Sequence, residues 1–475
     1  MRQNLLKIIS ALVLSNFLAC AIGSDYERPK SELSKSFASD QKFSTADPSL
    51  MWWKYFNDTT LNALIDEALL SNHDIDAAIA RVNEARALTW ETRLDLLPQI
   101  TANGGYYKGK SSEAALPFID DESLRRVEYY NAGFDANWEI DIFGRSLRAI
   151  EASIADRKRL VATLDDVLVS TISETASTYF NYVSAERNLK LAQRELRLNK
   201  MLFTHKQRLY ETGEIDRREF LTARITLIRS KQELPTLKSN VEQNKNALAV
   251  LTGKNPTTFK IKTLAAPKVF GYRGPINIGT PEALLKRRPD VRSAEQNLIA
   301  ANARAGYELG DLLPKLNFTG SFEYQAIEYS KLGNYDPGYV INPYISWVGL
   351  DFGRVLASIN AADEKYNATL AEYQQALKVA VADVQDKLAI FSAERQRFWL
   401  MRDLTQSQKA ISRLDRLRYR SGDISELSLV ESRISRVKSL RELTDSKNNL
   451  NNSLIAIYKS LGGGWESTTL SQADS

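Results

Sequence analysis

The chain has 475 residues but a single cysteine, Cys20, and only two histidines, His73 and His205. One cysteine cannot form an internal disulfide. The two histidines lie far apart in the sequence and lack the spacing of metal ligands, so we expect ordinary helix residues and no metal site. Gly253-Lys254 lacks the flanking residues of a phosphate loop, and no Gly-x-Ser-x-Gly nucleophile motif occurs. These absences argue against an enzyme, and we expect no catalytic residues and no cofactor.

Long apolar runs are also missing. A helix that crosses a bilayer needs about 20 apolar residues, and no stretch of the sequence reaches that length. The charge balance is nearly even, with 63 Lys and Arg against 58 Asp and Glu, and both signs are mixed along the chain. A nucleic-acid-binding protein would instead concentrate its basic residues on one face. We therefore expect neither a membrane-spanning helix nor a nucleic-acid partner.

The first 19 residues have the features of a signal peptide. Arg2 and Lys7 supply positive charge, an apolar core follows over residues 8–14, and a cleavage region precedes Cys20. A cysteine at this position resembles a bacterial lipobox, which implies a covalent lipid on Cys20. The alternative is a buried cysteine near an ordinary cleavage site. Ala21 stands where an inner-membrane retention signal would have Asp, so the resemblance implies sorting to the outer membrane.

An internal repeat organises the rest of the chain. Early motifs of the first half recur 216 positions later, and its later motifs recur after 209. The matches are Asp74 with Asp290, Leu97-Pro98 with Leu313-Pro314, Trp138 with Trp347, Phe143-Gly144-Arg145 with Phe352-Gly353-Arg354, and Thr212-Gly213 with Ser421-Gly422. The extra residues of the first copy fall in the polar stretch between residues 109 and 127, where we expect an exposed loop.

Each repeat contains the same series of predicted elements. A helix over 61–94, or 281–312 in the second copy, ends at a Leu-Pro pair. Period-two alternation then predicts two strands, followed by very long helical patterns. A helix over 146–211 would be about 100 Å long and its partner over 215–251 about 55 Å, lengths that favour coiled-coil packing. A soluble helical bundle or a coiled-coil adaptor would share these helices.

The hairpins distinguish this chain from such proteins. The runs over 99–108 and 315–325 have the length of a bilayer-spanning strand, about 9 to 11 residues. Four strands cannot close a barrel without unpaired edges, so several chains must contribute. The pattern predicts a multi-chain β-barrel that continues into a helical tube. Trp138 and Trp347 are expected to anchor the barrel at the membrane–water interface.

Three motifs together resemble the TolC-type outer-membrane factor family, in its lipoprotein branch serving resistance-nodulation-division pumps. They are Trp52-Trp53 with Phe56 and the stretch from Leu61 to Asn72, the run from Leu284 to Arg292 with Ala294-Glu295, and the closing Leu461-Gly462-Gly463-Gly464-Trp465. The resemblance covers nearly the whole mature chain. It implies a trimer whose twelve-stranded outer-membrane barrel, with four strands per chain, continues into a periplasmic α-helical tunnel that is closed at its far end.

The domains follow from the repeat and the resemblance. We expect a signal peptide over 1–19, a lipid-anchored N-terminal segment over 20–60, shorter tunnel helices over 61–98 and 281–314, membrane β-hairpins over 99–142 and 315–351, long tunnel helices over 143–253 and 352–461, and equatorial and C-terminal segments over 254–280 and 462–475.

The resemblance places the closed end at the two helix turns, where Gly213 and Gly422 suit a positive φ. Just beyond the second turn, Leu427 and Glu431 occupy the positions of a constricting leucine and an acidic residue, and three copies would form two rings. The alternatives are a core leucine and a solvated glutamate. Residues implied to contact one another near the gate are Tyr419 and Glu219. Ile424 replaces the family's basic residue, so Arg217 or Arg218 is the candidate substitute.

The function implied is a passive exit duct for drugs or other small toxic compounds, the outer-membrane component of a tripartite efflux pump. Its expected partners are two further copies of the chain, a periplasmic adaptor, an inner-membrane pump of the resistance-nodulation-division type and outer-membrane lipid. A duct for type I protein secretion is the alternative.

Overall fold

The computed structural model describes residues 21–30, 34, 36–37, 43–110, 126–261, 276–348 and 351–463. The signal peptide, Cys20, most of the first-repeat loop, parts of the expected equatorial and C-terminal segments, and Trp465 lie outside these residues. The chain divides into two units. Unit 1 contains residues 1–30, 82–160 and 294–373, and unit 2 contains residues 31–81, 161–293 and 374–475.

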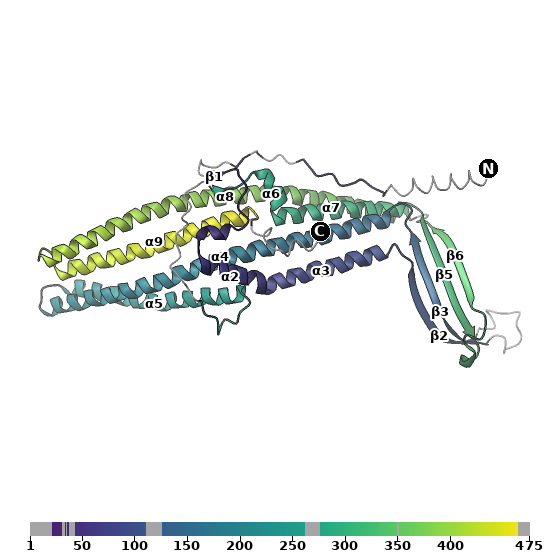
Figure 1. Ribbon diagram of the computed structural model, residues 1–475, viewed down its shortest axis with the longest axis horizontal. Coiled ribbons are helices and arrows are strands. Elements are labelled where there is room, and N and C mark those ends of the chain that lie inside the picture. Colours follow the sequence, from purple (N-terminus) through teal and green to yellow (C-terminus); the bar gives the residue numbers. More distant parts are fainter. Residues whose placement is uncertain are drawn as a thin grey trace. The chain divides into compact units, whose positions relative to one another are not determined.

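Unit 1 contains a four-stranded antiparallel sheet. Its strands are β2 (Gln99–Lys110), β3 (Arg126–Ile140), β5 (Lys315–Ala326) and β6 (Gly338–Ser346), in the order β2-β3-β5-β6 (Figure 1). A 3-10 turn, η2 (Gly310–Leu312), precedes β5, and another, η3 (Tyr329–Lys331), lies between β5 and β6. The strands predicted over 99–108 and 315–325 are confirmed and are slightly longer.

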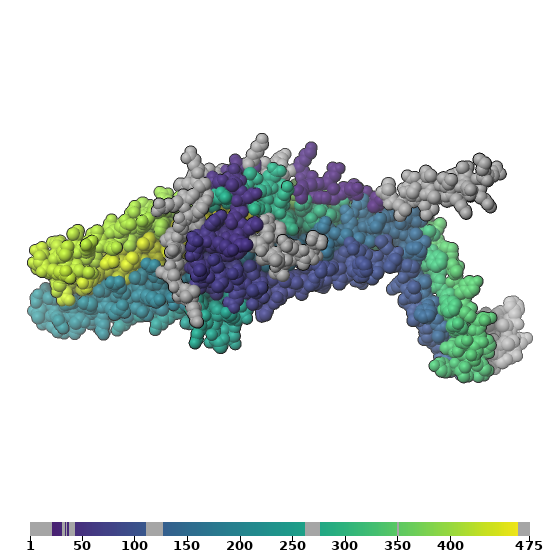
Figure 2. Space-filling view, viewed as in Figure 1, coloured from purple at the N-terminus to yellow at the C-terminus, as the bar shows by residue number. Residues whose placement is uncertain are grey.

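The two faces of the sheet differ in polarity. Ala102, Phe134, Phe322 and Tyr339 pair in one row across the four strands, and the three aromatic side chains are exposed. The adjacent row pairs Thr101, Asp135, Ser321 and Val340. Successive residues of a strand point to opposite faces, so one face is aromatic and the other largely polar. On the side visible in Figure 2 no helix of unit 1 covers the sheet.

The repeat holds at the level of strand register. Gln99 pairs with Asn137, and shifting these positions by 216 and 209 gives Lys315 and Ser346, which also pair. The matched tryptophans repeat their hydrogen bonds as well. Trp138 Nε1 donates to Leu96 O at 2.9 Å and Trp347 Nε1 to Leu312 O at 3.0 Å. The two hairpins are therefore equivalent copies.

Each shorter helix of the repeats is broken into two, contrary to expectation. The helix predicted over 61–94 consists of α2 (Thr59–Ser71) and α3 (His73–Leu94), because Asn72 leaves the helical conformation and its side chain accepts hydrogen bonds from the next turn's amides. The second copy consists of α6 (Pro281–Arg287) and α7 (Pro289–Leu309). Pro289 disfavours helical geometry at the preceding Arg288.

Unit 2 contains most of the long helices. These are α4 (Arg145–Glu211), α5 (Arg217–Leu251), α8 (Phe352–Arg420) and α9 (Glu426–Ser460), of which α4 and α8 begin in unit 1. Figure 1 shows α4 alongside α5 and α8 alongside α9. Among the described residues, no helix has both the length and the hydropathy needed to cross a membrane.

An aromatic core holds unit 2 together. It is centred on the 3-10 helix η1 (Trp52–Phe56). The fully buried Trp52 stacks on Tyr458 of α9 with ring centroids 5.3 Å apart, and Phe56 contacts Phe180 of α4 at 4.7 Å. A short parallel pair of strands, β1 (Phe43–Ser44) and β4 (Ile276–Asn277), lies in the same unit. The motif Trp52-Trp53 is thus structural, since aromatic burial dominates core energetics.

Candidate functional site at the helix turns

Two tight turns reverse the long helices within unit 2. Gly213 has a φ of 78° and Gly422 a φ of 82°, which confirms the predicted left-handed glycines. The amide after each glycine donates back into the preceding helix, from Glu214 to Leu209 O and from Asp423 to Arg418 O, both at 2.8 Å. These bonds satisfy carbonyls at the helix ends. Local backbone hydrogen bonds and the glycine conformation therefore define both turns, and the turn residues are exposed.

The next helices start with side-chain caps. Asp216 accepts a hydrogen bond from the amide of Glu219 at 2.8 Å, and Ser425 accepts one from the amide of Ser428 at 3.2 Å. Each cap satisfies a free amide in the first helical turn. The starting point of α9 is thus defined, and with it the orientation of the residues that follow the turn.

Leu427 and Glu431 lie on one face of α9, four residues apart. A neighbouring face, represented by Val430 and Ile434, is buried against Leu198 of α4. In the single chain Leu427 is half-buried and Glu431 is exposed. Neither residue is needed to complete the core of its own chain, so both remain available to other subunits.

The other residues predicted near the gate are not brought together within one chain. Glu219 pairs with Lys206 of α4 at 2.6 Å, and Tyr419 has an exposed fraction of 40%. Arg217 and Arg218 are exposed at the start of α5. Any contact of Tyr419 with Glu219 therefore has to form between subunits or in another state of the channel.

One polar contact near the turns was not predicted from the sequence. His205 Nε2 of α4 lies 3.4 Å from Glu426 Oε2, the residue just before Leu427. The sequence suggested only an ordinary helix residue at His205, because nothing in the order of residues pairs the first repeat with the second here. The contact ties the first turn of α9 to α4.

A second missed contact joins three helices farther from the turns. Arg441 Nη1 of α9 lies 3.0 Å from Glu195 Oε2 of α4 and 3.0 Å from Glu233 Oε2 of α5, and Arg441 Nη2 forms a second contact with Glu233. Its hydrogen bond to Glu233, followed by smaller contributions from Glu195, raises the pKa of Arg441 although burial acts in the opposite direction. Glu195 is only 7% exposed. This arginine clamp (Arg441, Glu195 and Glu233) thus links the helices of the two repeats.

We expect Arg441→Ala to destabilise the protein by about 3 kcal/mol, because the buried Glu195 carboxylate would lose its partner. The measurement is the thermal unfolding midpoint by circular dichroism in detergent. Lys438→Ala is the matched control, since Lys438 is an exposed cation one turn earlier on α9. Equal midpoints for the two variants would show that the clamp contributes no stability.

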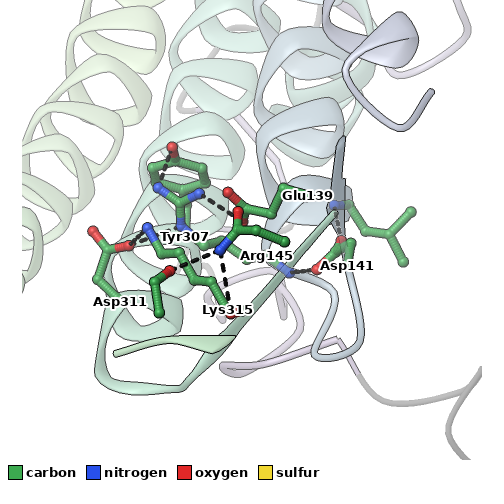
Figure 3. Close-up of polar contacts among 9 residues, drawn as sticks. Glu139, Asp141, Arg145, Tyr307, Asp311 and Lys315 are labelled. Atoms are coloured by element: carbon green, nitrogen blue, oxygen red, sulfur yellow. Dashed lines mark hydrogen bonds and ion pairs between the residues drawn. The ribbon is translucent and has the colours of Figure 1, made fainter. Parts of the chain in front are cut away.

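A polar cluster in unit 1 fixes the junction between the hairpins and the helices. Asp141 caps α4 by accepting from the amides of Arg145 at 2.8 Å and Leu147 at 3.1 Å. Arg145 Nε lies 2.9 Å from Asp311 Oδ1, and its guanidinium sits 3.8 Å above the ring of Tyr307 (Figure 3). This Arg145 junction (Asp141, Arg145, Tyr307 and Asp311) therefore joins the segment after the first hairpin to the segment before the second hairpin.

The segment after Cys20 is held at the same end of α4. Ile22 N donates to Phe143 O at 3.0 Å, and the buried guanidinium of Arg148 donates to Ile22 O at 2.8 Å and Gly23 O at 3.0 Å. A little farther along, Arg28 forms a two-pronged ion pair with Glu295. These contacts place Ile22 beside the turn that follows β3.

A family model described as outer membrane efflux protein matches residues 64–254 and 280–463. The chain belongs to this family. It is 28% identical over 437 residues to the pyoverdine export outer membrane protein OpmQ of Pseudomonas putida, covering 88% of this chain and 89% of that protein. It is 26% identical over 469 residues to the cation efflux system protein CusC of Escherichia coli, covering 97% and 99%.

Solved structures agree with the fold. The outer-membrane channel OprN is 28% identical, with a TM-score of 0.82 over 94% of this chain and all of that one. The open state of the Neisseria gonorrhoeae MtrE channel is 26% identical, with a TM-score of 0.80 over 94% and 99%.

Family membership confirms the predicted fold class and function. The chain is a subunit of a trimeric outer-membrane channel with four strands per chain, and it serves a tripartite efflux pump with a periplasmic adaptor and an inner-membrane pump of the resistance-nodulation-division type. Its place is the outer membrane, with the tunnel in the periplasm. The aromatic face of the sheet then meets lipid and the polar face lines the lumen.

Proposed function

We propose that this channel is a passive duct for small toxic compounds, without an enzymatic step, and that its gate lies at Leu427 and Glu431. The observation that carries the proposal is the face of α9 just beyond the Gly422 turn, which holds an apolar and an acidic side chain that the chain's own core does not use. Around a threefold axis this face gives one apolar ring and one acidic ring.

The class of substrate is open to a direct test. The names of the relatives mention pyoverdine in one case and cations in another, which supports small solutes over proteins. A strain that lacks the gene should accumulate dyes, drugs or metal ions and regain export with the wild-type gene. If such solutes leave the deletion strain normally, small toxic compounds are not the cargo and the proposed class of substrate is wrong.

We further propose that Cys20 carries a covalent lipid. The ordered contacts of Ile22 and Gly23 with α4 support it, because they hold the chain two residues after Cys20 next to the end of a membrane strand. A buried acyl chain adds about 0.8 kcal/mol of membrane affinity per CH₂, in addition to the barrel.

We expect Cys20→Ser to abolish incorporation of radiolabelled palmitate while leaving part of the export activity, since the strands still insert. Labelling and drug export are measured in the same cells. Ser24→Ala, four residues later, is the control and should label normally. Undiminished labelling of Cys20→Ser would rule out Cys20 as the lipid site.

A further inference from the structure

The two Phe-Gly-Arg motifs have different surroundings although their hairpins are equivalent. Arg145 of the first motif is enclosed by the second repeat, with 15% of its side chain exposed. Arg354 of the second motif is 82% exposed and pairs only with the nearby Asp351 at 2.8 Å within the described chain. Arg145 belongs to the first repeat and contacts the second repeat. Arg354 belongs to the second repeat, and the described chain has no third repeat for it to contact.

In a closed trimer, the second repeat is followed by the first repeat of the next subunit. We propose that the Arg145 junction recurs there, with Arg354 pairing with Asp95 of the partner subunit. The internal repeat gives the correspondence, because adding 209 to 145 gives 354 and subtracting 216 from 311 gives 95. The inference rests on the trimeric assembly and adds to it the residues that join one subunit to the next.

The same correspondence sets the register of the strands across the interface. Within the chain, Asn137 of β3 pairs with Thr319 of β5. Applying the two shifts places Ser346 of β6 opposite Asn103 of the partner subunit's β2. Both strands have one unpaired edge in the described sheet, and an unpaired edge in lipid is costly. The side chains agree as well, since Ser346 and Asn103 both belong to the polar face.

The proposed contact between subunits differs from the Arg145 junction in its residues. Glu91 replaces the stacking Tyr307, Leu94 replaces Gly310, and Gln99 replaces Lys315. A Cβ at Gly310 would lie 2.8 Å from Arg145 Cγ, so Leu94 of the partner subunit keeps Arg354 from approaching as closely. Arg354 instead faces two carboxylates, Asp95 and Glu91 of the partner subunit. The contact between subunits therefore lacks the ring stacking and the close packing of the Arg145 junction. Its remaining attraction is between charges, so salt should weaken it.

Charge reversal tests the ion pair. Arg354→Glu alone and Asp95→Arg alone should each raise severalfold the fraction of dissociated trimer at a fixed temperature on a semi-native gel. The two together should return that fraction to within about twofold of the wild type. Arg354→Glu combined with Glu84→Arg, an exposed carboxylate three turns earlier on α3, should give no recovery. If the trimer of the double variant dissociates as much as the trimer of the less stable single variant, Arg354 does not pair with Asp95 of the partner subunit.

Introduced cysteines test the register independently. Ser346→Cys is combined in turn with Thr101→Cys, Asn103→Cys and Gly105→Cys, three positions on the same face of β2, and dimers of the chain are followed under mild oxidation. The Asn103 pair should crosslink fastest, and single-cysteine variants control for Cys20. Faster crosslinking at 101 or 105 overturns the register. Native mass spectrometry of the wild type distinguishes failure of this contact from failure of the assembly. If the protein is a trimer but shows neither the charge-reversal recovery nor the preferred crosslink, only the proposed contact between subunits is wrong. If a monomer conducts, the trimeric assembly itself is wrong.

Discussion

Leu427→Ala should raise the single-channel conductance in planar bilayers roughly twofold or more, because three leucine side chains at the axis form an apolar constriction that expels water. The structure leaves Leu427 half-buried on a face of α9 that its own core does not fill. Truncation to alanine therefore widens and wets the ring without removing a core residue. The change is expected at all voltages, since it alters the narrowest cross-section.

The control for this variant is Leu414→Ala. Leu414 is an exposed leucine of α8, with 59% of its surface accessible, eight residues before the Gly422 turn. Its loss should leave conductance unchanged. If Leu427→Ala conducts like the wild type, the narrowest point of the tunnel lies elsewhere and the position inferred from the family resemblance is wrong.

Glu431→Gln should reduce both the preference for cations and the block by divalent cations, because a ring of three carboxylates attracts cations and binds divalent ones most strongly. Reversal potentials in a salt gradient measure the first effect, and conductance during a Mg²⁺ titration measures the second. Total conductance at high salt should change little, since the amide has nearly the same size.

Glu442→Gln is the matched control, because Glu442 is an exposed carboxylate on the same helix, three turns farther from the tip. Glu186 is less suitable, since it accepts a hydrogen bond from Tyr182 and pairs with Lys190. Unchanged selectivity in Glu431→Gln, or an equal loss in Glu442→Gln, would mean that no acidic ring stands at this level.

Local patterns predicted the features that depend on neighbours in the sequence. Period-two alternation identified the strands, and the internal repeat matched the two hairpins, because register and side-chain direction follow from that period. Glycine at positions 213 and 422 predicted the turns, since few other residues accept a positive φ. The break at Asn72 was missed because the helical pattern continues through it, although Asn72 followed by Asp74 is a recognisable capping signal.

Contacts between distant helices could not be predicted in this way. Arg441 looked like any other cation of a long helix, and only packing shows that it meets Glu195 and Glu233. His205 and Glu426 are likewise more than 200 positions apart. Charged residues are so frequent on these helices that the sequence offers many possible pairs. Packing in three dimensions selects among them.

The equal register of the two hairpins has a consequence for assembly. A half-length chain with one hairpin could close the same ring only as six separate copies, so its yield would depend on the sixth power of concentration. When two repeats are joined in one chain, every second contact between neighbouring repeats forms within a chain, at a high effective concentration. The yield then depends only on the third power of the chain concentration. Dilution in the periplasm thus hinders the assembly of this duct far less than that of a hexamer.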